Sequence, residues 1–342
     1  MPQTETDGRS QRERLVGVQY LRALAALQVV LYHCSTAAGR QVGLGGFGVP
    51  LFFVISGFIM VVITDENTRP GSFIRDRAIR VVPLYWLATT AVAVATLAFS
   101  FLSWPHLAAS YAFLPFDRPG AEKHFFPVLG VGWTLNYEML FYGLFTLSLL
   151  VPRRFHIAAL SLAMLGLTLA GFLVRPQIAA AAFWTQPILL MFLAGVWLGV
   201  WWRGERRWAL WPVLGCAMAY LIATRPEFVH FREALWRGMW AVLMLLAVLI
   251  LECRGLFSKP FRPLHLLGDA SYSLYLWHFP LLILLTPVLR GLGISGVWSF
   301  LGITMSASIA AGLLSYRFLE LPLLRFFRLR LYRKGVRVPA GP

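Results

Sequence analysis

Two residues with strong side-chain chemistry lie in one apolar stretch near the start of the chain. Arg22 and His33 both fall inside the segment 15–35. Their spacing is about three turns of helix, so the two side chains share a face about 16 Å apart along the axis. A charged residue inside an apolar span is costly and often marks a functional site. The pair predicts a joint role in lining a tunnel. The alternatives are that Arg22 snorkels to an interface and that His33 bonds a neighbouring helix.

Glu138 is an ionisable group inside a second apolar segment, 129–151, where it ends the run Trp-Thr-Leu-Asn-Tyr-Glu. A carboxylate within lipid either becomes protonated or finds a partner. The candidate partners are His33, Arg22 or an arginine that follows the second apolar segment. Glu138 is predicted either to form a structural ion pair or to take part in catalysis.

Three arginines, Arg75, Arg77 and Arg80, follow the second apolar segment. On a helical turn Arg77 and Arg80 are neighbours. Guanidinium groups bind phosphate oxygens in a bidentate manner, so this cluster is able to hold a phosphate-bearing ligand at the cytoplasmic face. The alternative is that the cluster only sets the orientation of the chain in the membrane.

A fourth group of candidate residues lies in the run Ser271 to His278, at the start of the segment 270–289. Tyr272, Tyr275 and Trp277 are able to hydrogen-bond to a sugar or to stack on it. The alternative is a belt of aromatic residues at the membrane interface.

The elements that position these residues are predicted to be membrane-spanning helices. Of 342 residues, 58% are apolar and 13% are charged, against about 25% charged in soluble domains. This excludes an ordinary cytosolic enzyme, a disordered chain and a disulfide scaffold. Irregular backbone cannot face lipid, so apolar segments of about 20 residues should be helices. Ten such segments are found at about 15–35, 46–64, 82–102, 129–151, 157–174, 180–202, 208–224, 236–252, 270–289 and 295–315.

The basic residues predict the orientation of these ten helices. The net charge is +16, and if every segment crosses, 22 of the 31 Lys and Arg lie on one side and 8 on the other. This bias places both ends in the cytoplasm and indicates membrane lipids, not nucleic acid, as partners. We expect a cytoplasmic segment at 1–14, a membrane-embedded domain at 15–322 and a basic cytoplasmic tail at 323–342. The three cysteines have no spacing typical of a metal site.

Composition and spacing do not distinguish between two kinds of membrane protein. An all-α integral membrane protein with a buried Arg, His and Glu is compatible with an enzyme or with a transporter or flippase for a lipid-linked sugar. A non-catalytic scaffold gives no reason for Arg22 and His33 to share a face.

Six sequence blocks, taken in order, resemble the membrane-embedded acyltransferase-3 family over residues 15–322. The resemblance is strongest to its exopolysaccharide-production (ExoZ-like) branch. Arg22 and His33 match an Arg-x10-His signature. The other blocks are Gly48 to Phe58; Arg77, Arg80, Pro83, Tyr85 and Trp86; Trp133 to Glu138; Ser271 to His278; and Tyr316 to Pro322. At two positions where many members carry an acidic residue, this chain has Gln19 and Pro50.

The resemblance implies transfer of an acyl group, usually acetyl, from cytoplasmic acyl-CoA to a glycan hydroxyl. The acceptor is implied to be a polysaccharide or lipid-linked glycan at the outer face of the plasma (inner) membrane. No metal and no permanently bound cofactor is expected. Some members carry an additional extracytoplasmic esterase-like domain, whereas this chain is expected to complete the transfer alone.

Acyl transfer needs a base for the attacking hydroxyl and a stabiliser for the oxyanion, and the residues of this chain permit such a mechanism. His33 is expected to be the general base or to carry the acyl group briefly as an acyl-imidazole. Glu138 is expected to orient His33 or to pair with an arginine. The CoA phosphates are assigned to Arg22, Arg75, Arg77 and Arg80, with Arg22 nearest the pantetheine arm. Further substrate contacts are predicted for Ser56, Tyr137, Tyr272, Tyr275 and His278.

Overall fold

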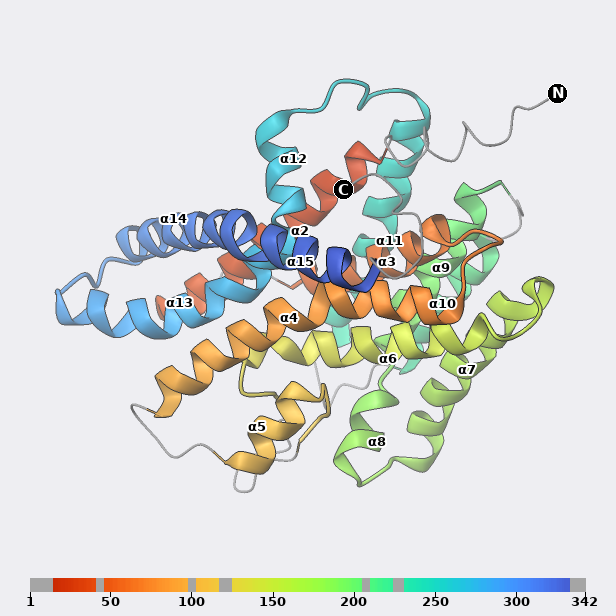
Figure 1. Ribbon diagram of the computed structural model, residues 1–342, viewed down its shortest axis with the longest axis horizontal. Coiled ribbons are helices and arrows are strands. Elements are labelled where there is room, and N and C mark those ends of the chain that lie inside the picture. The colour runs from red at the N-terminus through yellow and green to blue at the C-terminus, as the bar shows by residue number, and fades with distance from the viewer. Residues whose placement is uncertain are drawn as a thin grey trace.

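The computed structural model describes residues 15–40, 46–97, 103–116, 125–204, 210–223 and 231–332. In these ranges all regular structure is helical (Figure 1), which confirms the predicted all-α class. The longer helices are α2 (Val16–Ala37), α3 (Gly48–Ile63), α4 (Pro70–Leu97), α6 (Trp133–Ser148), α7 (Arg153–Val174), α9 (Leu189–Trp202), α10 (Leu210–Ala223), α11 (Phe231–Cys253), α13 (Ser271–Gly291), α14 (Val297–Ser315) and α15 (Leu321–Tyr332). The shorter ones are α5 (Trp104–Tyr111), α8 (Ala179–Trp184) and α12 (Arg262–Asp269).

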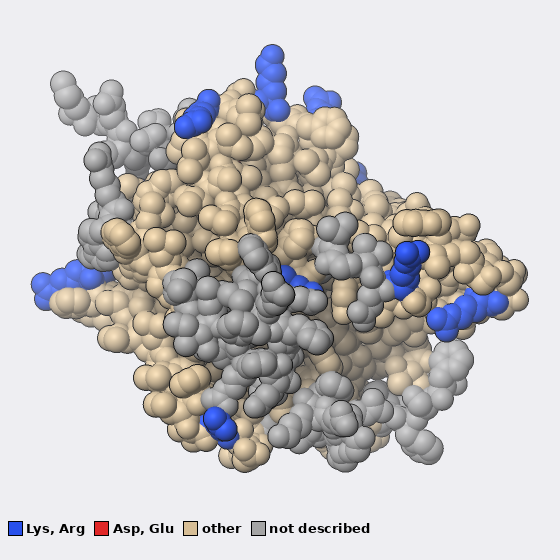
Figure 2. Space-filling view, turned by 180° about the vertical axis from the view of Figure 1, so that it is seen from behind, with Lys and Arg blue, Asp and Glu red and all other residues tan. Residues whose placement is uncertain are grey.

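Five helical stretches of the described ranges are long and apolar enough to cross a membrane. They are Pro70–Thr96, Arg153–Val174, Ala180–Trp202, Ser271–Gly291 and Val297–Leu331. The third joins α8 to α9, and the last joins α14 to α15. Helix α2 has 22 residues, but its polar side chains lower its mean hydropathy. On the face in Figure 2, the described residues show scattered Lys and Arg and no Asp or Glu. The chain is a membrane protein, while the ten-span count and the cytoplasmic placement of both ends stay predictions.

Helix α4 differs from the predicted segment 82–102, because it begins at Pro70. The apolar side chains of its first turns are buried in the core. Phe73 is 4% exposed and stacks on Phe145 of α6 with ring centroids 4.9 Å apart. The basic cluster expected in the connection 65–81 therefore lies on a rigid helix, and Pro83 is accommodated inside that helix.

The predicted basic tail, 323–342, also begins inside a helix. Helix α14 continues through a π-helical turn, Tyr316–Glu320, directly into α15. Leu323 packs against the main core and α15 contacts α4. Apolar and basic residues alternate at helical spacing here, so the chain stays helical to Tyr332, the last residue described in this region.

Helices α3 and α9 form the tightest helix pair of the core. A Cβ atom built on Gly57 would lie 2.0 Å from the carbonyl oxygen of Phe192, and one on Gly195 would lie 2.0 Å from that of Val54. Only glycine allows two helix backbones to approach this closely. Phe53 stacks on Phe192 at 4.4 Å beside this contact. The pair gives α3 a fixed position from which its other face lines the functional site.

Helix α2 is held along its length by α11, α12, α13 and α14. At its start, the backbone N–H of Gly17 donates to Glu252 Oε1 of α11 at 3.3 Å, so a carboxylate meets the positive end of the helix. Helix α13 packs on both α2 and α14 (Figure 1), and Gly312 of α14 lies against the backbone of Leu274. These contacts fix the helix that carries Arg22 and His33.

Candidate active site

A cavity of about 130 Å³ lies where α2, α3, α4, α6 and the start of α13 meet. A cavity of about 150 Å³ in another protein holds benzene, so this one has room for a small organic group. Its polar lining consists of Arg22, Ser56, Arg77, Arg80, Thr134, Glu138, Tyr142, Ser271, Tyr272 and Tyr275. The remaining lining residues are apolar. The structure thus brings together four of the groups of residues that the sequence indicated separately.

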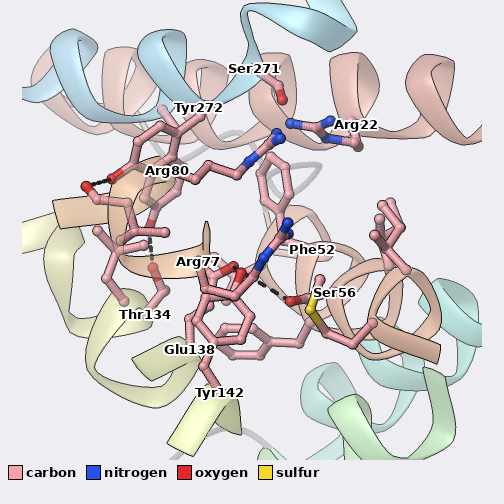
Figure 3. A pocket seen from close by; sticks show the side chains of 18 residues that line it. Arg22, Phe52, Ser56, Arg77, Arg80, Thr134, Glu138, Tyr142, Ser271 and Tyr272 are labelled. Carbon is pink, nitrogen blue, oxygen red and sulfur yellow. Dashed lines mark hydrogen bonds between the residues drawn. The ribbon is translucent and has the colours of Figure 1, made fainter. Parts of the chain in front are cut away.

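At one end of the cavity the guanidinium groups of Arg22 and Arg80 point toward each other beneath Ser271 (Figure 3). Arg22 Nη1 donates to Gln19 Oε1 at 3.2 Å, so its nearest polar neighbour is a neutral amide. Ser271 Oγ is buried and has no hydrogen-bond partner among the described residues. Two like charges beside an unpartnered hydroxyl, at the first residue of α13, form an arrangement that suits an anion.

Glu138 is held at the other end of the cavity by two hydroxyl groups. Ser56 Oγ donates to Glu138 Oε1 at 3.4 Å, and the hydroxyl of Tyr142 donates to the same oxygen. Arg77 lies beside them (Figure 3). No hydrogen bond joins Glu138 to His33 among the described residues. Whether Glu138 orients His33 or pairs with an arginine stays a prediction.

Positive charge prevails among the residues that line the cavity. Three arginines and one glutamate line it, which leaves a net charge of +2 in the lining. Within the described part of the chain, none of these arginines lies within 4.0 Å of a carboxylate oxygen, although Asp269 and the buried Glu320 lie near enough to interact electrostatically with Arg22 from outside the lining. Arg77 Nε is buried without a hydrogen-bond partner there. The lining itself therefore suits an anionic ligand.

The tyrosines of the predicted sugar-binding run form one wall of the cavity. The hydroxyl of Tyr272 donates to the carbonyl oxygen of Val81 at 2.7 Å. The hydroxyl of Tyr275 donates to Val131 O at 2.7 Å and lies 2.7 Å from Thr134 Oγ1. These bonds tie α13 to α4 and α6 and occupy the hydroxyl groups. The rings, more than the hydroxyls, face the cavity.

His33 lies in a different place, at the wall of a second, more open hollow of about 400 Å³. This hollow is lined by His33, Thr36, Ala37, Phe279, Leu282, Ile283, Thr286 and Pro287. The sequence predicted a tunnel shared by Arg22 and His33, and the structure gives each residue its own compartment. Phe52, which lines the cavity, also packs against a second apolar cluster, and that cluster includes Leu282 of the hollow.

A second histidine stands behind His33. The rings of His33 and His278 lie 5.2 Å apart, and the ring of Tyr275 lies 6.1 Å from that of His278. His278 is fully buried; its Nδ1 contacts Leu274 O at 3.1 Å, and its Nε2 has no partner among the described residues. It lines neither compartment, so its predicted contact with substrate stays a prediction.

Two other predicted residues lie away from both compartments. Tyr137 donates to Phe183 O at 2.7 Å and stacks on that ring. Arg75 lies 4.0 Å from Asp76 on a partly exposed part of α4. In contrast, the sequence reasoning assigned no role to Ser271 and Tyr142. Their positions in the sequence are the feature that could have identified them: Ser271 is the first residue of α13, and Tyr142 lies one helical turn after Glu138.

Comparison with known proteins shows the family of the chain. A family model described as an acyltransferase domain matches residues 15–317. The chain belongs to the acyltransferase-3 family. It is 37% identical over 318 residues to the exopolysaccharide production protein ExoZ of Rhizobium meliloti (strain 1021), covering 90% of this chain and 98% of that protein.

More distant members of the acyltransferase-3 family are also similar to it. The peptidoglycan O-acetyltransferase OatA of Listeria monocytogenes is 25% identical over 366 residues, which cover 92% of this chain and 56% of the relative. No solved structure matches the chain. The family and the helices together establish a membrane acyltransferase, and the resemblance found in the six sequence blocks is confirmed.

Proposed function

We propose that this chain transfers an acyl group, with acetyl as the first candidate, from cytoplasmic acyl-CoA to a hydroxyl of an exported polysaccharide or its lipid-linked precursor. The observation that carries the proposal is the convergence of Arg22, Arg77 and Arg80 on one cavity in which Glu138 is the single carboxylate among the lining residues. The similarity to ExoZ supports an exopolysaccharide acceptor, and the similarity to OatA supports acetyl and O-acyl transfer. The plasma (inner) membrane is the location that suits both substrates.

The donor is assigned to the cavity. Arg22, Arg80 and the hydroxyl of Ser271 bind phosphate oxygens of CoA, because the two guanidinium groups and the unpartnered hydroxyl converge at one end of the cavity. The pantetheine arm then runs along α2 toward His33, an interval of about 16 Å.

The chemical step is assigned to His33. The imidazole accepts the proton of the acceptor hydroxyl as that oxygen attacks the thioester carbonyl carbon. The carbon–sulfur bond then breaks, and the CoA thiolate takes the proton back from the imidazolium. A short-lived acyl-imidazole on His33 is the alternative route. His278 packs on His33 and holds its ring in place.

Incubation of the purified protein with acetyl-CoA labelled in the acetyl group tests this function. We expect the label to appear on the acceptor glycan and free CoA to appear in equal amount. A transporter or flippase for a lipid-linked sugar consumes no thioester. Absence of CoA release in the presence of acceptor would therefore exclude acyl transfer from this donor.

A further inference from the structure

We propose that the connection between α11 and α12, together with the exposed side of α12, binds the headgroups of anionic phospholipids. This α11–α12 surface is built from exposed apolar and exposed basic side chains. They are Leu256, Phe261, Leu266, Arg254, Lys259 and Arg262. None of them lines the cavity or the hollow, so the inference does not depend on the proposed function.

Three large apolar side chains of this surface are exposed. Leu256 and Phe261 are each 64% exposed, and Leu266 is 46% exposed. The segment 254–269 lies just before α13, which is long and apolar enough to cross a membrane. It is therefore placed where a predicted span leaves the hydrocarbon. At that level, exposed apolar side chains beside charged ones enter the boundary between lipid headgroups and acyl chains.

Positive charge accompanies these apolar side chains and is not offset nearby in the sequence. The segment 253–268 contains three Lys or Arg and no Asp or Glu. The two flanking carboxylates have other partners, since Glu252 accepts a backbone N–H of α2 and Asp269 lies 3.2 Å from His265. Basic side chains project at the top of Figure 2, the end of the molecule at which the connection before α12 lies in Figure 1. This surface therefore attracts anions.

Helix α12 turns both kinds of side chain to the same side. Arg262 and Leu266 lie one turn apart and are both exposed, so they are neighbours on the helix surface. The opposite side packs on α2, where a Cβ atom built on Gly268 would lie 2.3 Å from the carbonyl oxygen of Gln19. The packing against α2 therefore fixes which side of α12 faces outward.

Contacts with α2 also fix the connection that precedes α12. The ring of Phe257 meets that of Tyr20 edge to face, with centroids 5.6 Å apart, and lies against Gly17. The hydroxyl of Tyr20 accepts a hydrogen bond from the backbone N–H of Phe261. The exposed side chains are thus placed before a ligand binds, which reduces the entropy lost on binding.

An anionic phospholipid matches both features of the α11–α12 surface at once. Its phosphate suits guanidinium and ammonium groups, and its acyl chains suit Leu256 and Phe261. A soluble acidic partner would meet the charges and leave the apolar side chains in water. A zwitterionic lipid would meet the apolar side chains and bring no net charge to the basic ones. The combination therefore favours an anionic phospholipid as the occupant.

Photolabelling with phosphatidylglycerol that carries a photoreactive group in its acyl chain, near the glycerol, tests the inference. The full-length protein is held in phosphatidylcholine nanodiscs that contain a low, fixed fraction of this probe. We expect the label in the segment 253–269. Unlabelled phosphatidylglycerol should compete it away, whereas the same amount of additional phosphatidylcholine should not. Equal competition by the two lipids would overturn the inference, because the surface would then have no preference for charge.

Charge variants locate the lipid on the α11–α12 surface. Arg262→Gln should weaken the apparent affinity for phosphatidylglycerol about fivefold, the contribution of one basic residue near an anionic surface. Combining it with Arg254→Gln and Lys259→Gln should weaken this affinity about 100-fold. The matched control is Arg69→Gln, which removes an exposed arginine from the connection 65–69, where two acidic residues accompany it. The control should be labelled like the wild type, and wild-type labelling of the triple variant would contradict the inference.

Two soluble competitors distinguish the possible occupants. Glycerol phosphate has the charge of the headgroup without acyl chains, and polyglutamate represents an acidic protein segment. Each should compete with the probe at least about tenfold more weakly than phosphatidylglycerol, since neither covers the apolar side chains. If either competes as well as the lipid, the surface binds that class of ligand and the inference is wrong. Because labelling requires no acyl transfer, such a result leaves the proposed function standing.

Discussion

The cavity at the start of α2 and the hollow at its end differ above all in charge. Three arginines line the first, whereas no permanently charged side chain lines the second. One helix supplies a key residue to each, Arg22 to the cavity and His33 to the hollow. The difference fits the proposed function, in which the charged cavity holds the donor and His33 accepts the proton of the acceptor. Removal of residues on the two sides should therefore affect different kinetic constants.

The largest effect is expected at the hollow. His33→Ala should lower the rate of acetyl transfer at least about 100-fold, because no other group of the hollow accepts a proton readily. Binding of labelled acetyl-CoA, measured by equilibrium dialysis, should change less than about twofold. The control His265→Ala, on α12, should transfer at the wild-type rate. Transfer by His33→Ala near the wild-type rate would contradict the assignment of the chemical step.

The next effect is expected in the cavity. Arg22→Ala should raise KM for acetyl-CoA about 30-fold, the loss of a charge-assisted hydrogen bond, and should leave KM for the acceptor unchanged. Arg22→Lys should lie between, since lysine keeps the charge but loses the bidentate geometry. Arg325→Gln, which changes an exposed arginine on α15, is the control and should leave KM for acetyl-CoA unchanged. If donor affinity is unchanged in Arg22→Ala, Arg22 has a structural role only. The charge of the cavity would then not explain donor binding.

A substitution at the contact between α3 and α9 should lower the stability of the whole protein and should not affect the cavity and the hollow differently. In Gly57→Ala the new Cβ would lie 2.0 Å from Phe192 O, and such overpacking costs about 2 kcal/mol of unfolding free energy. Thermal unfolding in detergent should detect it. Gly143→Ala is the matched control, because a Cβ there meets nothing within 4 Å. A Gly57→Ala protein as stable as Gly143→Ala would show that α3 and α9 are not packed as described.

The smallest effect is expected from a single added carboxylate. Gln19 Oε1 accepts a hydrogen bond from Arg22, so Gln19→Glu would place an acid beside that guanidinium. We expect KM for acetyl-CoA to rise about threefold, the size of a partly exposed ion pair. The acceptor constants should stay as they are. An unchanged or lower donor KM would mean that the charge of Arg22 is not used in donor binding.

Local sequence patterns predicted much of the secondary structure. Each of the ten apolar segments contains a described helix, because hydrophobic runs of that length have few other solutions. The exceptions have a shared cause. From Pro70 onward and again after Ser315, amphipathic residues extend the helix beyond the apolar run. The polar composition of these stretches predicts a connection between helices instead. Helix α12, which packs on α2, was missed in the same way.

The candidate site was predictable as a set of residues but not as an arrangement. Arg22, Arg77, Arg80 and Glu138 were each identified from residue type and position, and they do meet in one cavity. Their partners were not predictable. Glu138 is held by Ser56 and Tyr142, and Ser271 lies beside the paired arginines, because helices distant in the sequence cross at those points.

By itself, the sequence determined the helical membrane class, the family and the placement of Arg22 and His33 on one helix, since hydrophobic periodicity and motif spacing are local properties of the chain. Only the tertiary structure decided that these two residues face separate compartments. That outcome depends on which helices pack against each end of α2: α3, α4 and α6 enclose the cavity with Arg22, whereas residues of α13 from Phe279 on line the hollow with His33. Contacts of this kind arise from helix packing, which no single segment encodes.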